Sequence, residues 1–301
     1  AAGLMVLAEL DPLSQIELIA ITAVGIAFCS ATQDIVIDAY RIESIEAEYQ
    51  AAMAAMYVFG YRVALLVAGA GTFYIAEYIG WNAAYSAMAL FMFIGMVTTL
   101  LSREPEHQQD DKRIAQQQKI ESALGVQTQK GVLQRLSTWF SDAVVSPFAD
   151  FFVRNGSTAI WILALIALYK MSDITMGVMA NPFYLDLGFS KKEIADISKI
   201  FGFFMTIFGA ALGGVLVLRY GLMKPLLLGA VLVASTNLLF VLLALLEPNL
   251  SLLAVVISAD NLSGGIATAV FIAYLSSLTN SAYTATQYAL FSSLMTLPAK
   301  L

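Results

Sequence analysis

Three ionisable residues, Asp34, Asp38 and Arg41, lie near the end of an otherwise apolar stretch. Their spacing of i, i+4 and i+7 predicts that the three side chains share one face of a helix. A charged group at the centre of a membrane-length helix costs about 2.5 to 3.5 kcal/mol on insertion scales, so such groups usually face a protein interior, a partner or a water-filled path. This face favours a membrane protein that moves a solute or a proton.

Each of these residues also has a structural interpretation. Asp38 and Arg41 are spaced i, i+3 and can form a local ion pair, and Arg41 near the end of the stretch can snorkel to the membrane surface. For these two residues both interpretations stay open. Asp34 lies a turn deeper, beside Gln33, where desolvation favours the neutral carboxyl. We therefore interpret Asp34 as functional.

Further charges interrupt other apolar stretches. Arg62 lies about ten residues into the next predicted span, too deep for a loop charge, and is a candidate counter-ion of Asp34 or Asp38. Lys170 and Asp173, in the segment LYKMSD, are spaced i, i+3. They can neutralise each other or face a cavity and bind substrate, and the sequence leaves both possibilities open.

The carboxylate of Asp260, in the middle of an apolar run, has no obvious ion-pair partner on its own helix. Asp260, next to Asn261, lies near the middle of one apolar run, and Lys199 lies in the outer third of another. Asp260 is a candidate proton site or a partner of Lys170 or Lys199. A lone acid in a bilayer resists ionisation and a nearby cation restores it, so alternating exposure can make protonation depend on which side is open.

The elements that must position these residues are membrane-length helices. The chain of 301 residues is 59% hydrophobic and 13% charged, with a mean hydropathy of +0.76, whereas a soluble domain carries about 25% charged residues. A span needs about 20 apolar residues, and none of the runs alternates as barrel strands do. The composition predicts an all-α polytopic membrane protein with seven complete spans, near residues 16–41, 52–78, 82–101, 157–180, 196–218, 222–246 and 251–279.

One long hydrophilic stretch divides the chain. Residues 102–156 are predicted to form a cytoplasmic linker between part of a first bundle, 1–101, and part of a second, 157–301. Within the linker, Val132 to Phe152 has the mixed composition of an amphipathic surface segment, and disorder is favoured for 104–130. A cytoplasmic linker places nine Lys and Arg residues inside and only Lys191 and Lys192 outside, as the positive-inside rule requires.

Both ends of the sequence are expected to be halves of spans. The first ten residues and the segment that starts near Tyr283 are apolar but too short to cross a bilayer. No cleavable signal peptide is recognised. Glycine pairs such as Gly209 and Gly213 in a GxxxG pattern predict close helix packing and nothing more specific.

Several function classes find no support. The lone Cys29 excludes an intrachain disulfide and is interpreted as a packing residue. His107 has no Cys or His neighbours, so neither a metal site nor a catalytic triad is indicated, and no phosphate-binding GxxxxGK[ST] motif is present. We expect no enzyme activity, cofactor or metal, and a secondary transporter rather than an ATP-driven pump.

A set of motifs carries a family resemblance. The segment SATQDIVIDAYRIE, followed in order by GYR, SREPE, SPFADFFVRN, LYKMSD, FYLDLGFSKKEI, DNLSGG and TATQYALFSSL, resembles the AmpG muropeptide permeases, which belong to the major facilitator superfamily. The resemblance covers nearly all of the chain. It implies two pseudo-symmetric six-helix bundles around a central cavity, with this chain running from the end of the third helix to the start of the eleventh, so truncated at both ends.

The resemblance also implies a function. It is the proton-linked import of N-acetylglucosaminyl-1,6-anhydro-N-acetylmuramyl peptides from the periplasm to the cytoplasm across the bacterial inner membrane, for peptidoglycan recycling. The expected partners are this substrate, protons and the lipid bilayer, with no nucleic acid. The linker seen here is longer than in the shorter family members, and the absent early helices would remove part of the cavity, so transport by this fragment alone is not expected.

Site residues follow from the matching positions. Gln33 can exchange hydrogen bonds with sugar or peptide groups, the small Ala31 allows close approach, and the cations attract carboxylates. The implied substrate-binding set is Ala31, Gln33, Arg62, Lys170, Lys199 and Asn261. The implied proton-coupling set is Asp34, Asp38, Asp173 and Asp260.

Two rival interpretations stay open. A related acetyl-coenzyme A transporter, or another small-solute transporter, shares the superfamily but requires more basic residues in its cavity to hold phosphates. A membrane sensor or scaffold would use the embedded charges only to fix helix register, and it predicts no substrate-dependent uptake and no effect of a protonophore.

Overall fold

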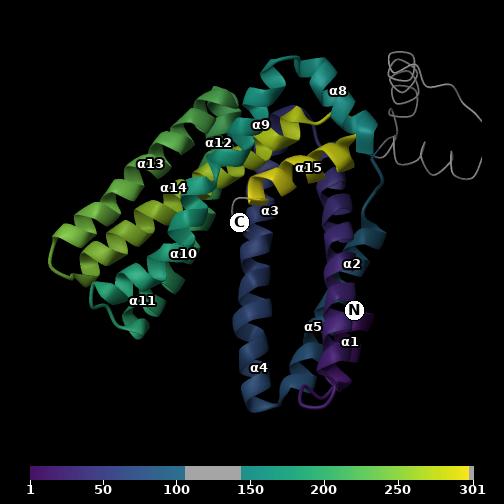
Figure 1. Cartoon of the computed structure of the whole chain (residues 1–301), viewed down its shortest axis with the longest axis vertical. Coiled ribbons are helices and arrows are strands. Elements are labelled where there is room, and N and C mark those ends of the chain that lie inside the picture. The colour runs from purple at the N-terminus through teal and green to yellow at the C-terminus, as the bar shows by residue number, and fades with distance from the viewer. Residues whose placement is uncertain (106–143, 298–301) are drawn as a thin grey trace, which may run out of the picture. The chain divides into compact units, whose positions relative to one another are not determined.

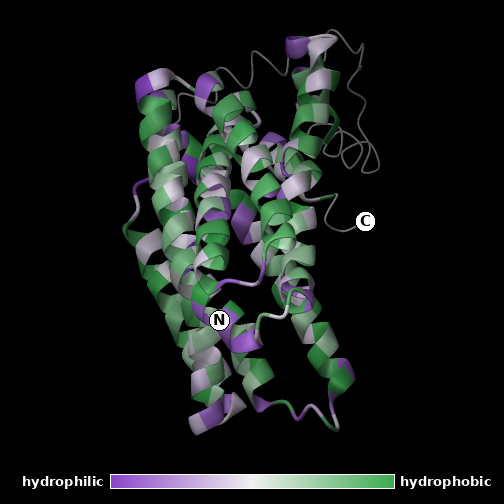
Figure 2. Cartoon of the chain, turned by 90° about the vertical axis from the view of Figure 1, so that its left-hand side faces the viewer, coloured by the Kyte–Doolittle hydropathy of each residue, from purple (hydrophilic) through white to green (hydrophobic). Residues whose placement is uncertain are grey.

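The computed structural model describes residues 1–105 and 144–297, without the side chains of residues 199 and 200 (Figure 1). Every regular element in these residues is helical. Within the described residues, seven helical segments are long and apolar enough to cross a membrane: 16–43, 47–78, 81–101, 158–186, 203–220, 223–245 and 250–278. Hydrophobic residues cover most of their length (Figure 2). The all-α expectation and the seven spans are confirmed.

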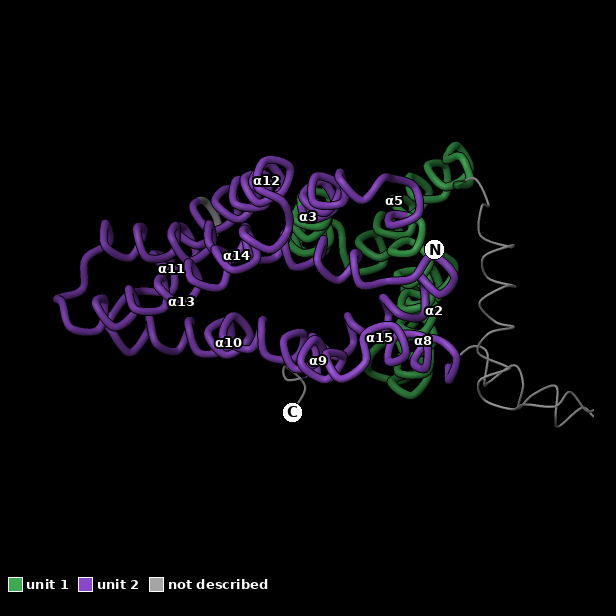
Figure 3. The backbone as a smooth tube through the Cα atoms, turned by 90° about the horizontal axis from the view of Figure 1, so that it is seen from above, with its two compact units in different colours: residues 1–40, 59–106 green, residues 41–58, 107–301 purple. Residues whose placement is uncertain are grey.

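The chain divides into two compact units (Figure 3). Unit 1 comprises Ala1–Tyr40 and Phe59–Glu106, and unit 2 comprises Arg41–Val58 and His107–Leu301. Residues 41–58, which lie in the first predicted bundle, therefore pack with unit 2. The linker and bundle boundaries stay predictions, because residues 106–143 lie outside the described part.

Unit 1 is built from long helices with one irregular turn. Its elements are α1 (Ala2–Glu9), most of α2 (Ile16–Glu43), the second half of α3 (Gln50–Leu66), a π-helical turn η2 (Val67–Gly71), α4 (Thr72–Tyr78) and α5 (Trp81–Leu101). Both α1 and α4 pack against α5. A short 3-10 helix η1 (Ala47–Tyr49), which leads from α2 to α3, belongs to unit 2.

Unit 2 is centred on one long helix. Its further elements are α8 (Ser146–Asn155), α9 (Thr158–Tyr169), α10 (Met171–Asp186), α11 (Lys191–Ile197), a π-helical turn η4 (Ser198–Gly202), α12 (Phe203–Tyr220), α13 (Met223–Leu245), α14 (Leu250–Leu278) and α15 (Thr284–Thr296). Helix α14 packs against both α12 and α13 (Figure 1). Its residues from Leu253 to Ser276 include much of the buried core.

Glycines explain how closely α12 and α14 approach. A Cβ placed on Gly209 would lie 2.2 Å from the backbone oxygen of Leu262, and one on Gly265 would lie 2.4 Å from that of Thr206. Both oxygens belong to the backbone of a helix, so they cannot move aside as the end of a flexible side chain can. The packing role predicted for the Gly209 and Gly213 pair is confirmed.

Candidate functional site

A charged cluster lies inside the membrane-spanning segment formed by α9 and α10. Lys170 stands between these helices, pairs with Asp173 and donates a second hydrogen bond from Nζ to Thr268 Oγ1 of α14 at 2.9 Å. The pairing that the sequence left open is therefore formed. Because Thr268 comes from a different helix, the cluster also ties the α9–α10 junction to the core of unit 2.

The interruption of the span at Lys170 positions both charges. Helix α9 ends at Tyr169 and α10 starts at Met171, so Asp173 falls in the first turn of α10, where the helix dipole favours a negative charge. The side chains of Lys170 and Asp173 are 16% and 23% exposed. Such partial burial makes their attraction stronger than that of a surface pair, while leaving both within reach of a ligand.

Asp260 completes the cluster. This partly buried residue of α14 interacts electrostatically with both Asp173 and Lys170. Its backbone oxygen accepts a bond from Ser263 Oγ at 2.9 Å, and Ser263 also pairs with Thr236 of α13 at 2.9 Å. Among these three charged groups, two carboxylates share one ammonium. The formal charges of these three groups therefore sum to one negative charge.

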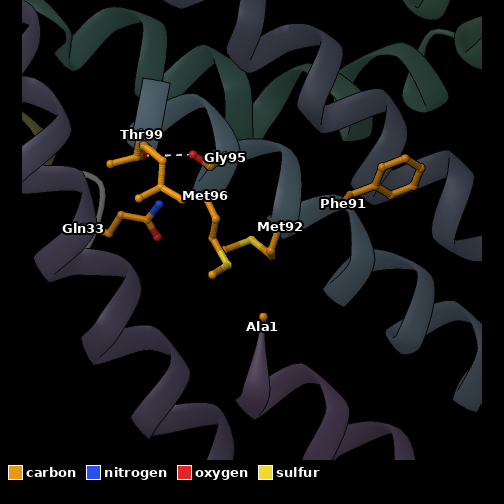
Figure 4. Close-up of a pocket in the computed structure, with 8 residues that line it drawn as sticks. Ala1, Gln33, Phe91, Met92, Gly95, Met96 and Thr99 are labelled. Carbon is orange, nitrogen blue, oxygen red and sulfur yellow. Dashed lines mark hydrogen bonds between the residues drawn. The ribbon is translucent and has the colours of Figure 1, made fainter. Parts of the chain in front are cut away.

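Gln33 lies apart from this cluster, in unit 1. It borders a cavity of about 530 Å³ between α2 and α5, and its carboxamide points toward the methionines of α5 (Figure 4). The lining residues are Ala1, Gln33, Phe91, Met92, Gly95, Met96, Thr99 and Leu100. Thr99 donates its hydroxyl to the Gly95 oxygen at 2.9 Å, which leaves the Gln33 carboxamide as a hydrogen-bonding group on this wall. Ala31 is exposed on the same helix but does not line the cavity.

The charges of α2 differ in burial. The helix runs unbroken through Asp34, Asp38 and Arg41, which confirms their helical spacing. Asp34 is exposed and Asp38 is half-buried. Arg41 is only 5% exposed, so the idea that it snorkels to the membrane surface is wrong.

Arg41 is held by aromatic and hydroxyl groups instead. Its Nη2 donates to Ser276 Oγ at 3.2 Å, and its guanidinium lies over the rings of Tyr57 and Tyr288, at 5.6 and 5.2 Å from their centroids. Cation–π contacts of this kind stabilise a desolvated arginine.

The remaining predicted residues are not brought into the Lys170 cluster by any described contact. Arg62 Nε is buried without a hydrogen-bond partner, and within the described residues Arg62 forms no ion pair with Asp34. Asn261 donates to the Ile257 oxygen at 2.8 Å and accepts from Thr206 Oγ1 at 3.0 Å. Its Nδ2 thus bonds within α14, and its Oδ1 links α14 to α12. The Lys199 side chain lies outside the described residues.

Sequence reasoning missed a buried polar network at α8. Asp150, 5% exposed, accepts from Asn280 Nδ2 at 3.1 Å and from Gln287 Nε2 at 2.9 Å. Arg154 lies 3.7 Å from Asp150 and donates to the Leu278 oxygen at 2.8 Å. Only the i, i+4 spacing of Asp150 and Arg154 is visible in the sequence. The network joins α8 to the turn before α15. The hydrogen bond from Lys170 to Thr268 likewise joins the α9–α10 junction to α14.

Comparison with known proteins places the chain in a family. A profile described as Major Facilitator Superfamily matches residues 1–299. The chain is 34% identical over 288 residues to the anhydromuropeptide permease of Escherichia coli K12, covering 95% of this chain and 53% of that protein. It is 32% identical over 270 residues to the putative transporter AmpG 4 of Rickettsia conorii, covering 89% of this chain and 60% of that protein.

An uncharacterized protein of Haemophilus influenzae is 33% identical over 306 residues, which covers 99% of this chain and 66% of the relative. The chain thus spans between 53% and 66% of the length of these three relatives. The resemblance to the AmpG permeases is confirmed by two of them. With seven membrane-length apolar segments and a family match over almost all of its length, this multi-pass membrane protein belongs to the Major Facilitator Superfamily.

Proposed function

We propose that the full-length protein containing this chain is a secondary transporter that imports anhydromuropeptides together with protons across the bacterial inner membrane, for peptidoglycan recycling. The observation that carries the proposal is the cluster of Lys170, Asp173 and Asp260 inside a membrane-spanning region. Similarity to a relative named anhydromuropeptide permease supports the substrate class.

The cluster can couple a proton to a carboxylate ligand. Asp173 and Asp260 both interact with the single ammonium of Lys170. When a proton neutralises Asp260, Lys170 no longer serves two carboxylates and can attract a carboxylate of the substrate's peptide. When the proton leaves, the regained negative charge competes with the bound carboxylate and favours release. Exposure of the cluster to alternate sides would make this exchange directional.

The residues of unit 1 are assigned to the substrate. Gln33 has the donor and acceptor groups that sugar hydroxyls and acetamido groups require, and it borders a cavity. Ala31, which lies outside that cavity, is assigned to the substrate only by the family resemblance, and Arg62 supplies a second cation. Asp34 and Asp38 are the alternative proton carriers to Asp260.

Uptake measurements test the proposal. The full-length gene product is expressed in permease-deficient cells, and uptake of labelled anhydromuropeptide is followed with and without a protonophore. We expect uptake that the protonophore abolishes. A correctly inserted protein without uptake would refute the substrate assignment, and direct uptake of labelled acetyl-coenzyme A or of another labelled solute would then identify the rival transporter. Inertness toward all solutes would favour a sensor or scaffold.

A cation in the cluster and a cation in the first turn of α13 provide matched variants. Lys170→Gln removes the ammonium that faces Asp173 and Thr268, whereas Lys224→Gln changes a lysine in the first turn of α13. We expect Lys170→Gln to reduce uptake at least about tenfold, because it leaves partly buried carboxylates without their cation. Unchanged affinity in Lys170→Gln would remove this residue from the binding assignment.

A further inference from the structure

A groove lies between α10 and the helix that follows it in unit 2. Its volume is about 380 Å³, within the size range of small-ligand sites, about 300 to 1,000 Å³. The residues that line it are Asn181, Leu185, Lys191, Ile194, Ala195 and Ser198. None of them belongs to the Lys170 cluster, so the groove is a separate feature of the same unit.

The lining follows helical register. On the continuous helical segment of α11 and η4, the lining positions are spaced i, i+3, i+4 and i+7 from Lys191, and on α10 they are spaced i and i+4 from Asn181. One face of each helix therefore forms one wall. Lys192, next in the chain, does not line the groove.

Among the lining residues that the structure describes, Lys191 is the only charged one. Within the described part of the chain, its ammonium forms no ion pair and the Asn181 carboxamide forms no hydrogen bond. The nearby Glu193 is engaged elsewhere, because its carboxylate accepts from the backbone and hydroxyl of Ser190 at 2.8 and 2.7 Å in the cap of α11. The described lining thus contains one cation and no carboxylate.

The chemistry of the walls selects a ligand class. An ammonium and a carboxamide can hold a carboxylate, the Ser198 hydroxyl adds a further donor or acceptor, and Leu185, Ile194 and Ala195 offer an apolar surface. A carboxylate that carries a small apolar side chain, such as an alanine-like residue of a short peptide, matches this combination.

The groove also lies at one end of a candidate membrane span. Lys191 follows the span 158–186 at the end opposite to the predicted cytoplasmic linker, which is the predicted outer face. We propose that this groove is an outer subsite that binds a carboxylate of the substrate's peptide before the substrate reaches the Lys170 cluster. This inference rests on the proposed import of anhydromuropeptides.

Adjacent lysines supply the test. In the full-length protein, the KM for uptake of labelled anhydromuropeptide is measured for Lys191→Gln and for the matched control Lys192→Gln. We expect Lys191→Gln to raise KM about fivefold at unchanged kcat, as removal of an exposed ion pair does. Lys192→Gln should leave KM unchanged, and Lys191→Arg, which keeps the charge, should retain most of the affinity.

A second substrate separates a carboxylate contact from a general effect. The same protein is assayed with an anhydromuropeptide whose peptide carboxylates have been converted to amides, for which Lys191→Gln should leave KM unchanged. Equal KM values for Lys191→Gln and Lys192→Gln, in a wild-type protein that transports, would overturn the groove assignment alone, as would an equal effect of Lys191→Gln on the amidated substrate. Absence of uptake by the wild-type protein would instead overturn the proposed function and the groove assignment with it.

Discussion

Helices α2 and α14 are similar in length and hydropathy but differ in how much of each is buried. They contain 28 and 29 residues, both have a hydropathy of 1.6 in their most apolar window, and both carry acids. None of the residues in that window of α2 is buried in the protein, whereas half of those in α14 are. Apolar length therefore predicts a membrane span, but it does not predict whether other helices cover that span.

The glycines of the two helices also differ in their surroundings. Gly265 of α14 faces backbone atoms of α12, and Gly209 of α12 faces backbone atoms of α14. Gly25 of α2 has no atom of another segment within 4 Å of the place a Cβ would occupy. Without a hydrophobic driving force inside a bilayer, helices associate where backbones can approach closely.

The largest effect is expected from filling that contact. Gly209→Ala places a methyl group against the Leu262 oxygen and should destabilise unit 2 by about 3 kcal/mol, because neither backbone can yield. Thermal unfolding in detergent measures this change. Gly264→Ala and Gly25→Ala, which meet open space, are the controls. A similar loss of stability in all three variants would mean that helix propensity or expression, not packing, sets the result.

The acids of the two helices provide the next comparison. Asp260 interacts with Lys170 and Asp173, whereas Asp34 is exposed. We expect Asp260→Asn to lower protonophore-sensitive uptake at least about tenfold, in the range of a lost acid–base group, and Asp34→Asn to change it less than about twofold. Both variants are assayed at equal amounts of inserted full-length protein. A larger loss of uptake in Asp34→Asn than in Asp260→Asn would assign the proton site to α2.

A smaller effect is expected where α2 does become buried. Within Ile16–Glu43 the only buried residue is Arg41, which lies over Tyr57 and Tyr288. Arg41→Lys keeps the charge but loses the planar contact with two rings, and it should lower the free energy of unfolding by about 1 kcal/mol.

The matched control for Arg41 is Arg219→Lys. Arg219 is exposed and lies over the ring of its neighbour Tyr220 at 5.5 Å. Its replacement should leave the thermal transition in detergent unchanged. Equal shifts for the two substitutions would argue against a contribution from the paired rings.

The sequence predicted what depends on composition and local spacing. The seven spans follow from apolar length, and the pairing of Lys170 with Asp173 was one of two outcomes allowed by i, i+3 spacing. The partner Thr268 is 98 residues away from Lys170, and no local pattern encodes that contact. The burial of Arg41 was also unpredictable, because it depends on Ser276 and Tyr288, which come from distant helices.

Asn261 is a residue for which the sequence suggested a ligand-binding role and the structure shows bonds within the protein. Its position in the middle of a span made it a candidate ligand group, yet its carboxamide bonds Thr206 and the Ile257 oxygen. A polar residue in an apolar helix predicts that a partner exists. Whether that partner is a ligand or another helix depends on tertiary packing, and here the packing of α12 against α14 supplies Thr206.

The smallest predicted effect concerns how the two helices begin. The turn before α2 is closed by Asp11, whose Oδ1 accepts from the Leu13 amide at 3.0 Å, whereas α14 is capped by Asn249, whose Oδ1 accepts from the Ser251 amide at 2.8 Å. Hydrogen bonds from the Leu13 backbone and the Ser14 hydroxyl hold the pKa of Asp11 below its ordinary value of 3.8. Because the pKa of Asp11 is lower in the folded turn, the ionised carboxylate stabilises the turn at pH values above 3.8. This stabilisation is lost as the pH falls through the folded-state pKa.

Amide hydrogen exchange can detect this difference between the two helix starts. After correction for intrinsic exchange, lowering the pH from about 6 to about 3 should reduce the protection of the Leu13 amide but not that of the Ser251 amide, because the cap of α14 carries no titrating group. Asp11→Asn should remove the pH dependence at Leu13 and make the start of α2 behave like the start of α14. Parallel loss of protection at both amides would show that acid loosens the whole protein and that the charge of Asp11 has no separate effect.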